Sequence, residues 1–104
     1  MPYHNEIPIM VFAADLNDPQ SVVVVPDEAY VMVKKQTPHW VSWQGEIVDV
    51  KFEDVTDKPE KPEVHRGHCK MKNAPLKHGK YKYTISLRVN GKIYTADPQL
   101  IVGD

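Results

Sequence analysis

Residues 79–94, GKYKYTISLRVNGKIY, contain the clearest structural pattern in the chain. From Tyr81 to Val89, apolar and aromatic side chains alternate with polar ones, which is the period of a strand buried on one face. Asn90-Gly91 follows, and this pair is the strongest two-residue signal for a type I′ turn because both turn residues need positive φ. The stretch therefore predicts a β-hairpin whose return strand covers 92–96.

The turn also fixes which side chains of the hairpin share a face. A two-residue turn sets three cross-strand pairs, Val89 with Lys92, Arg88 with Ile93 and Leu87 with Tyr94. In this register Leu87 and Tyr94 point to the core, whereas Ile93 falls on the polar face. An apolar residue there is either exposed or covered by a partner. One expectation is therefore a homo-oligomer formed through the 79–96 hairpin.

The rest of the chain has the pattern of further short strands separated by Pro, Gly and Asp. We expect these strands at 7–13, 21–25, 29–35, 40–44, 46–52, near 69–71, and at 99–102. Pro8 favours an edge position for the first strand, and the valines of 21–25 are typical of a buried strand. In 46–52, Val48, Val50 and Phe52 are expected to share one face. Residues 1–6 are interpreted as a short N-terminal tail.

Length and composition indicate one globular domain covering 1–104. The chain is 41% hydrophobic and 26% charged, which is typical of a folded protein. No segment shows a helical period. About seven to eight closely spaced strands predict an all-β fold, an antiparallel Greek-key β-sandwich.

Charge and cysteine content exclude several classes of protein. The formal net charge of −1 gives no long-range attraction to nucleic acid or to an acidic membrane. Cys69 is the single cysteine, so neither an intramolecular disulfide nor a cysteine-based structural zinc site can form. The N-terminus MPYHNEIP lacks the pattern of a signal peptide. We expect a cytoplasmic protein, or an exported one whose leader has been removed.

The order of these features resembles a small cupredoxin-like β-sandwich, and an immunoglobulin-like sandwich shares much of the same pattern. The resemblance covers about residues 20 to 102. It rests on Val25-Pro26-Asp27, Val33-Lys34-Lys35, Val41-Ser42-Trp43, the strand 48–52, Gly79-Lys80-Tyr81-Lys82-Tyr83 and the ending Asp97-Pro98-Gln99-Leu100-Ile101-Val102.

The chain departs from that family at the copper ligands. The resemblance implies a histidine ligand at the start of the strand 48–52 and a cysteine ligand two residues after Tyr83. Val48 and Ile85 occupy these positions, and residues 86–104 contain neither histidine nor methionine. A blue-copper site needs two imidazoles and a thiolate. The resemblance therefore implies the scaffold without its electron-transfer chemistry.

The segment 65–71, HRGHCKM, gathers the side chains best suited to a soft metal ion. In one interpretation, His65 and His68 converge across Gly67, with Cys69 or Met71 as a third ligand. In the other, Cys69 and Met71 are core residues and the histidines are solvated. The spacing belongs to no known metal motif, so both interpretations remain open.

The aromatic residues are expected to divide between core and surface. Tyr81, Tyr83 and Trp43 have the inward phase of their strands. Trp40 has the phase opposite to Trp43. Either it forms an exposed surface with His39, Tyr3 and His4, or it is covered by the N-terminal tail or by the long irregular segment 53–77.

Together these features predict a non-catalytic module for protein interaction or a structural role, without a cofactor. The chain has no Gly-rich phosphate loop, no Gly-x-Ser-x-Gly and no His-Glu-x-x-His motif. The alternative function is a small soft-metal-binding protein that uses His65, His68, Cys69 and Met71. For an unknown protein partner, the contact residues are expected to be His39, Trp40, Asn90, Gly91 and Ile93.

Overall fold

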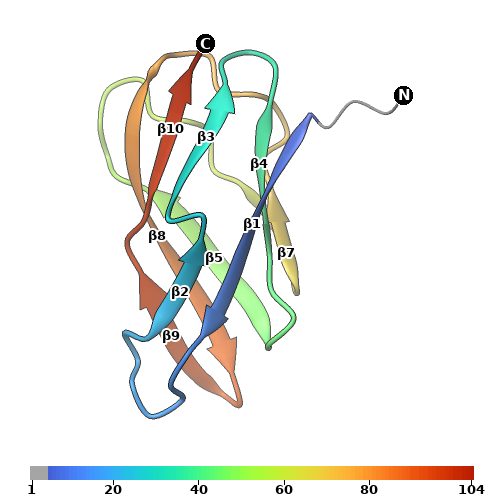
Figure 1. Ribbon diagram of the computed structural model, residues 1–104, viewed down its shortest axis with the longest axis vertical. Coiled ribbons are helices and arrows are strands. Elements are labelled where there is room, and N and C mark those ends of the chain that lie inside the picture. The colour runs from blue at the N-terminus through green and yellow to red at the C-terminus, as the bar shows by residue number, and fades with distance from the viewer. Residues whose placement is uncertain (1–4) are drawn as a thin grey trace.

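The computed structural model describes residues 5–104, and these residues form an all-β fold (Figure 1). The strands in chain order are β1 (Glu6–Ala13), β2 (Val22–Val25), β3 (Glu28–Met32), β4 (Thr37–Val41), β5 (Glu46–Phe52), β6 (Glu63–His65), β7 (His68–Lys70), β8 (Gly79–Val89), β9 (Lys92–Ala96) and β10 (Gln99–Gly103). Residues 1–4 of the expected tail lie outside the described residues, and Glu6 already belongs to β1.

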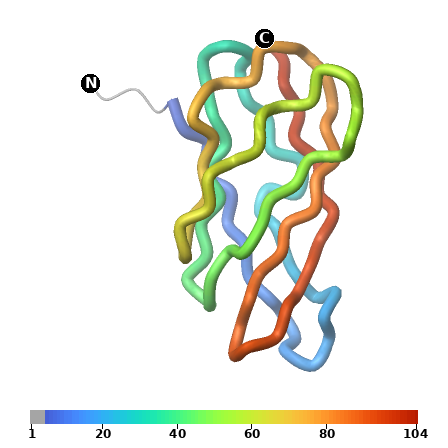
Figure 2. Tube along the Cα trace, turned by 180° about the vertical axis from the view of Figure 1, so that it is seen from behind, coloured from blue at the N-terminus to red at the C-terminus, as the bar shows by residue number. Residues whose placement is uncertain are grey.

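The strands form two sheets that enclose one hydrophobic core. Sheet A has the order β2-β1-β4-β7-β6. Sheet B has the order β3-β10-β8-β5, and β9 pairs with the far half of β8. The chain trace seen from behind shows β5 and β8 crossing the molecule side by side, which agrees with their pairing (Figure 2). The β-sandwich class expected from the sequence is confirmed.

The hairpin of β8 and β9 forms as expected. Its register pairs Val89 with Lys92, Arg88 with Ile93 and Leu87 with Tyr94. The turn residues Asn90 and Gly91 have φ of 52° and 79°, the positive values that a type I′ turn requires. Side chains of β8 alternate regularly between core and solvent. Because β8 pairs with β10, β5 and β9, it is the central strand of sheet B.

The pairing differs from a wholly antiparallel sandwich in two places, because β1 pairs with β4 and β10 pairs with β3 in parallel. Figure 1 shows the cause. β2 and β3 run in nearly the same direction, and the chain passes from sheet A to sheet B between them. The next strand, β4, therefore returns to sheet A with the direction of β1, and both sheets are mixed.

Three expectations about single strands were wrong. β1 lies between β2 and β4, not at an edge. β2 pairs only with residues 10–13, so Pro8 precedes that ladder and interrupts none of its hydrogen bonds. β2 is itself an edge strand, with Val25 50% exposed. In β5 the register shifts between Ile47 and Asp49, and this bulge places Ile47 instead of Val48 on the buried face with Val50.

Candidate functional site

The outer face of sheet A carries an unusual row of side chains. Alternation along the strands, fixed by the cross-strand registers, places Val25, Met10, Val41, His68 and His65 next to one another on this face, in that order. The row begins on the edge strand β2 and ends on the opposite edge strand β6. It is apolar over β2, β1 and β4 and carries imidazoles over β7 and β6.

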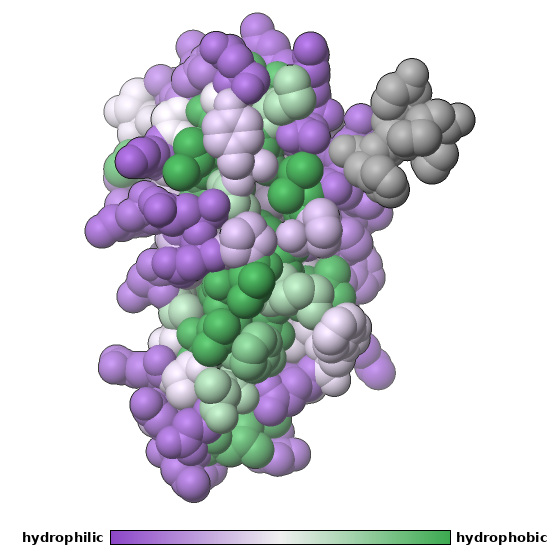
Figure 3. All heavy atoms as spheres, viewed as in Figure 1, coloured by the Kyte–Doolittle hydropathy of each residue, from purple (hydrophilic) through white to green (hydrophobic). Residues whose placement is uncertain are grey.

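The apolar part of this face is larger than the row itself. We call it the apolar patch and define it by Pro8, Met10, Phe12, Val23, Val25 and Val41. Phe12 is 41% exposed and Val25 is 50% exposed. Figure 3 shows a hydrophobic area in the middle of the molecule in this view, over β1 and β2. A sheet face that meets water normally carries polar residues, so a continuous apolar face indicates a surface that becomes covered.

The other part of the face is a histidine cluster, defined by His39 on β4, His65 on β6 and His68 on β7. The His39 Nε2 and His68 Nδ1 atoms are 3.3 Å apart and within hydrogen-bond distance, so one ring nitrogen donates and the other accepts. The rings of His65 and His68 stack with their centres 5.2 Å apart. The strand pairings β4–β7 and β6–β7 hold all three residues on one surface.

Two carboxylates border the histidine cluster. Glu6 lies 3.8 Å from His39 Nδ1, and Glu63 lies 3.7 Å from His65 Nε2. Burial lowers the pKa of His39, with further lowering by the charges of His68 and Lys70 and an opposing effect from Glu6. Burial therefore favours the neutral form of His39 more than it is favoured in an exposed histidine.

The four residues proposed from the sequence as a soft-metal site do not face one point. His65 and His68 lie on the outer face, whereas Cys69 is 0% exposed and Met71 is 3% exposed, both within the core. His68 and Cys69 are neighbours on a strand, and successive side chains of a strand point to opposite faces. Within residues 5–104, no group of three or more His, Cys, Asp and Glu side chains is arranged, as it stands, to hold a metal ion.

Cys69 is expected to be chemically inert in the folded protein. Burial raises the pKa of its thiol to about 12, with a smaller contribution from Asp49. The reactive thiolate is thus both scarce and shielded. With Ellman's reagent at pH 8, native protein should react at least about a hundredfold more slowly than protein unfolded in guanidinium. Fast reaction of the native protein would contradict this placement.

The expected roles of the two tryptophans were wrong, since Trp40 was expected among the exposed contact residues and Trp43 in the core. Trp40 is 0% exposed, whereas Trp43 is 85% exposed. The strand spans Thr37–Val41, so Trp40 lies inside it on the buried face and Trp43 falls in the loop to β5. Of the other expected contact residues, His39 lies on the outer face of sheet A. Asn90, Gly91 and Ile93 are exposed at the hairpin, Ile93 by 45%.

The apolar patch was not predicted from the sequence, although the sequence contains a pattern that indicates it. In 7–13 both strand phases are apolar, and 22–25 is valine throughout. Strands with two apolar faces are expected where both faces are covered. One face of each strand packs on the core, so the second face indicates a further contact.

An open cleft of about 600 Å³ lies between the β5–β6 loop and the β7–β8 loop. Its lining includes Lys58, Pro59, Leu76 and Tyr81, but no histidine, cysteine or serine. It therefore lacks the Ser–His and Cys–His nucleophile–base pairs.

Comparison with known proteins adds no assignment. No protein-family model matches the chain, and no curated protein shows significant similarity to it. In the part of the chain that the structure describes, no helix has the length and apolar character needed to cross a membrane.

Proposed function

We propose that this protein is a non-catalytic interaction module whose contact surface is the apolar patch on sheet A and whose partner is a second copy of the chain. The observation that supports this function best is the continuity of the patch across three neighbouring strands. Side chains on β2, β1 and β4 meet there without a charged residue among them.

The layout of the face is that of a protein interface. An apolar centre is bordered by polar groups, here the histidine cluster and Glu6. Because the patch has no formal charge, two copies related by a two-fold axis can stack their patches without like-charge repulsion. Two sheets packed face to face are a common arrangement in β proteins.

The size of the patch indicates a weak complex. Strands spaced about 4.8 Å apart and rising about 3.3 Å per residue give three strands, over the five residues from Pro8 to Phe12, a face of roughly 240 Å². A standard interface buries about 800 Å² on each partner. We therefore expect self-association with a Kd of roughly tens to hundreds of micromolar.

Sedimentation equilibrium of wild type, Val25→Lys and Val55→Lys tests this function. The two valines are similarly exposed, by 50% and 46%, but Val55 lies in the β5–β6 loop and outside the patch. Val25→Lys should weaken self-association by at least about tenfold, since a charge would enter an apolar contact. Val55→Lys should match wild type.

Two outcomes would contradict this assignment. The first is a wild-type protein that stays monomeric at roughly 2 mM, above the expected range of Kd; an apolar contact with an unrelated protein would then replace self-association. The second is dissociation by Ile93→Lys but not by Val25→Lys, which would move the interface to the 79–96 hairpin.

A further inference from the structure

The histidine cluster contains a pair of nitrogen atoms at a spacing that metal ions impose. A tetrahedral ion with metal–nitrogen bonds of about 2.0–2.1 Å holds its donor atoms about 3.3 Å apart. His39 Nε2 and His68 Nδ1 are 3.3 Å apart in this structure. They come from strands β4 and β7, whose ladder fixes the two backbones relative to each other.

We propose that His39 and His68, joined by His65, form a binding site for a divalent transition-metal ion on the outer face of sheet A. This inference does not depend on self-association. The site differs from the segment 65–71 proposed from the sequence, because Cys69 and Met71 face the core and His39 comes from a distant part of the chain. It also lies away from Val48 and Ile85, which are on sheet B and occupy the positions where the cupredoxin resemblance would place copper ligands.

His65 supplies the third ligand after a side-chain rotation. Its ring stacks on that of His68, with the centres 5.2 Å apart, and its side chain is 52% exposed, so solvent leaves it room to turn. The third ligand must be recruited, since no three-residue group within residues 5–104 stands ready for a metal. Water completes the coordination, as it does at open zinc sites.

Glu6 lies where its carboxylate can accept a hydrogen bond from His39 and so orient the ring of this ligand. Histidine ligands commonly donate their second ring N–H to a carboxylate, which orients the ring and raises its basicity. Glu6 lies 3.8 Å from His39 Nδ1, on the side of the ring opposite to the proposed ligand atom. A small movement closes this distance to a hydrogen bond. Glu63, 3.7 Å from His65 Nε2, has the same relation to His65.

The donor set selects the class of metal. Imidazoles without a thiolate favour Zn²⁺, Ni²⁺ and Cu²⁺, and affinity for such sites rises from Ni²⁺ to Cu²⁺. Mg²⁺ and Ca²⁺ prefer oxygen ligands and are expected to bind no tighter to wild type than to variants without the histidines.

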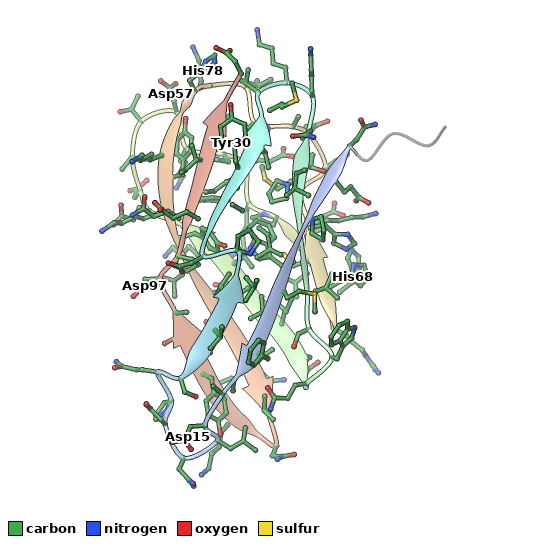
Figure 4. All side chains as sticks on the ribbon, in the orientation of Figure 1. Asp15, Tyr30, Asp57, His68, His78 and Asp97 are labelled. Carbon is green, nitrogen blue, oxygen red and sulfur yellow. The ribbon has the colours of Figure 1, made fainter. Side chains whose placement is uncertain are left out.

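Isothermal titration with Zn²⁺, and separately with Cu²⁺, tests the site. Wild type should bind one ion per chain, and the His39→Gln/His68→Gln double variant should lose at least about 100-fold in affinity. His65→Gln should lose about tenfold. The matched control is His78→Gln, because His78 lies at the top of the molecule in Figure 4, away from His68 at its side, and pairs with Asp104. Ring ¹⁵N shifts in NMR should move for His39 and His68 and not for His78.

Cys69→Ala separates this site from one that uses the thiol. Its Zn²⁺ affinity should equal that of wild type, and Cu²⁺-loaded wild type should show no intense visible thiolate band. The proposal is overturned if wild type binds Zn²⁺ no more tightly than the double variant. Loss of binding in Cys69→Ala or in His78→Gln would overturn it as well. Circular dichroism of each variant verifies that the fold is retained.

Discussion

Replacing Trp40 with alanine is expected to lower the free energy of unfolding by about 3–5 kcal/mol. The Trp40 side chain is fully buried, and its ring packs edge-on against Phe52 and Tyr83 at centre distances of 6.4 and 5.3 Å. Removing it leaves a cavity between the two sheets that the rigid ladders cannot close. For a domain of this size we expect a fall in Tm of roughly 15 °C or more.

Part of this cost comes from a hydrogen bond inside the core. Trp40 Nε1 donates to the Tyr83 hydroxyl at 2.9 Å, and burial raises the pKa of that hydroxyl. Trp40→Phe and Tyr83→Phe should each cost about 1–3 kcal/mol, because each leaves a buried polar group without its partner. The double variant should cost less than the sum of the two, since no polar group then remains unpaired.

Urea unfolding followed by circular dichroism measures these differences. Trp43→Ala is the matched control, because the same substitution at an 85% exposed tryptophan should change stability by less than about 0.5 kcal/mol. Equal effects at the two tryptophans would contradict the assignment of Trp40 to the core. Additive effects of Trp40→Phe and Tyr83→Phe would contradict the role of their hydrogen bond.

The two tryptophans also show where sequence reasoning reaches its limit. The 79–96 hairpin could be predicted to the level of individual pairs, because a two-residue turn fixes its register locally. No comparable turn precedes Trp40. Its phase depends on where β4 begins and on its parallel pairing with β1, and both are set by contacts between distant segments. The strand was expected to start at residue 40 but starts at residue 37, and as a result Trp43 was assigned to the core and Trp40 to the surface.

The full membership of the histidine cluster could not be predicted from the sequence for the same reason. His65 and His68 were found because they are neighbours in the chain. His39 was not joined to them, since it reaches His68 only through the pairing of β4 with β7, twenty-nine positions away. Cys69 and Met71 were joined to them on proximity alone, although strand alternation sends Cys69 to the opposite face from His68. Sequence spacing identified suitable donors but could not select the set that shares a surface.

Gly45→Ala is expected to lower the free energy of unfolding by about 2–5 kcal/mol. Gly45 lies in the loop between β4 and β5 with φ of +86°, a conformation that costs an alanine about 1–2 kcal/mol. A Cβ there would also overlap the backbone oxygen of Arg88 on the central strand β8. Backbone cannot turn aside as a flexible side chain does, so β5 must shift against β8, and overpacking of this kind costs about 1–3 kcal/mol more.

Gly91→Ala separates the two contributions to this cost. Gly91 has a nearly equal φ of +79°, but a Cβ there would meet no atom within 4 Å. Its substitution should therefore cost only the backbone part, about 1–2 kcal/mol. The difference between the variants in urea unfolding reports the close approach of the loop to β8. If both variants lose the same stability, the approach at Arg88 is looser than the structure places it, and the start of β5 is not fixed against β8 by this glycine.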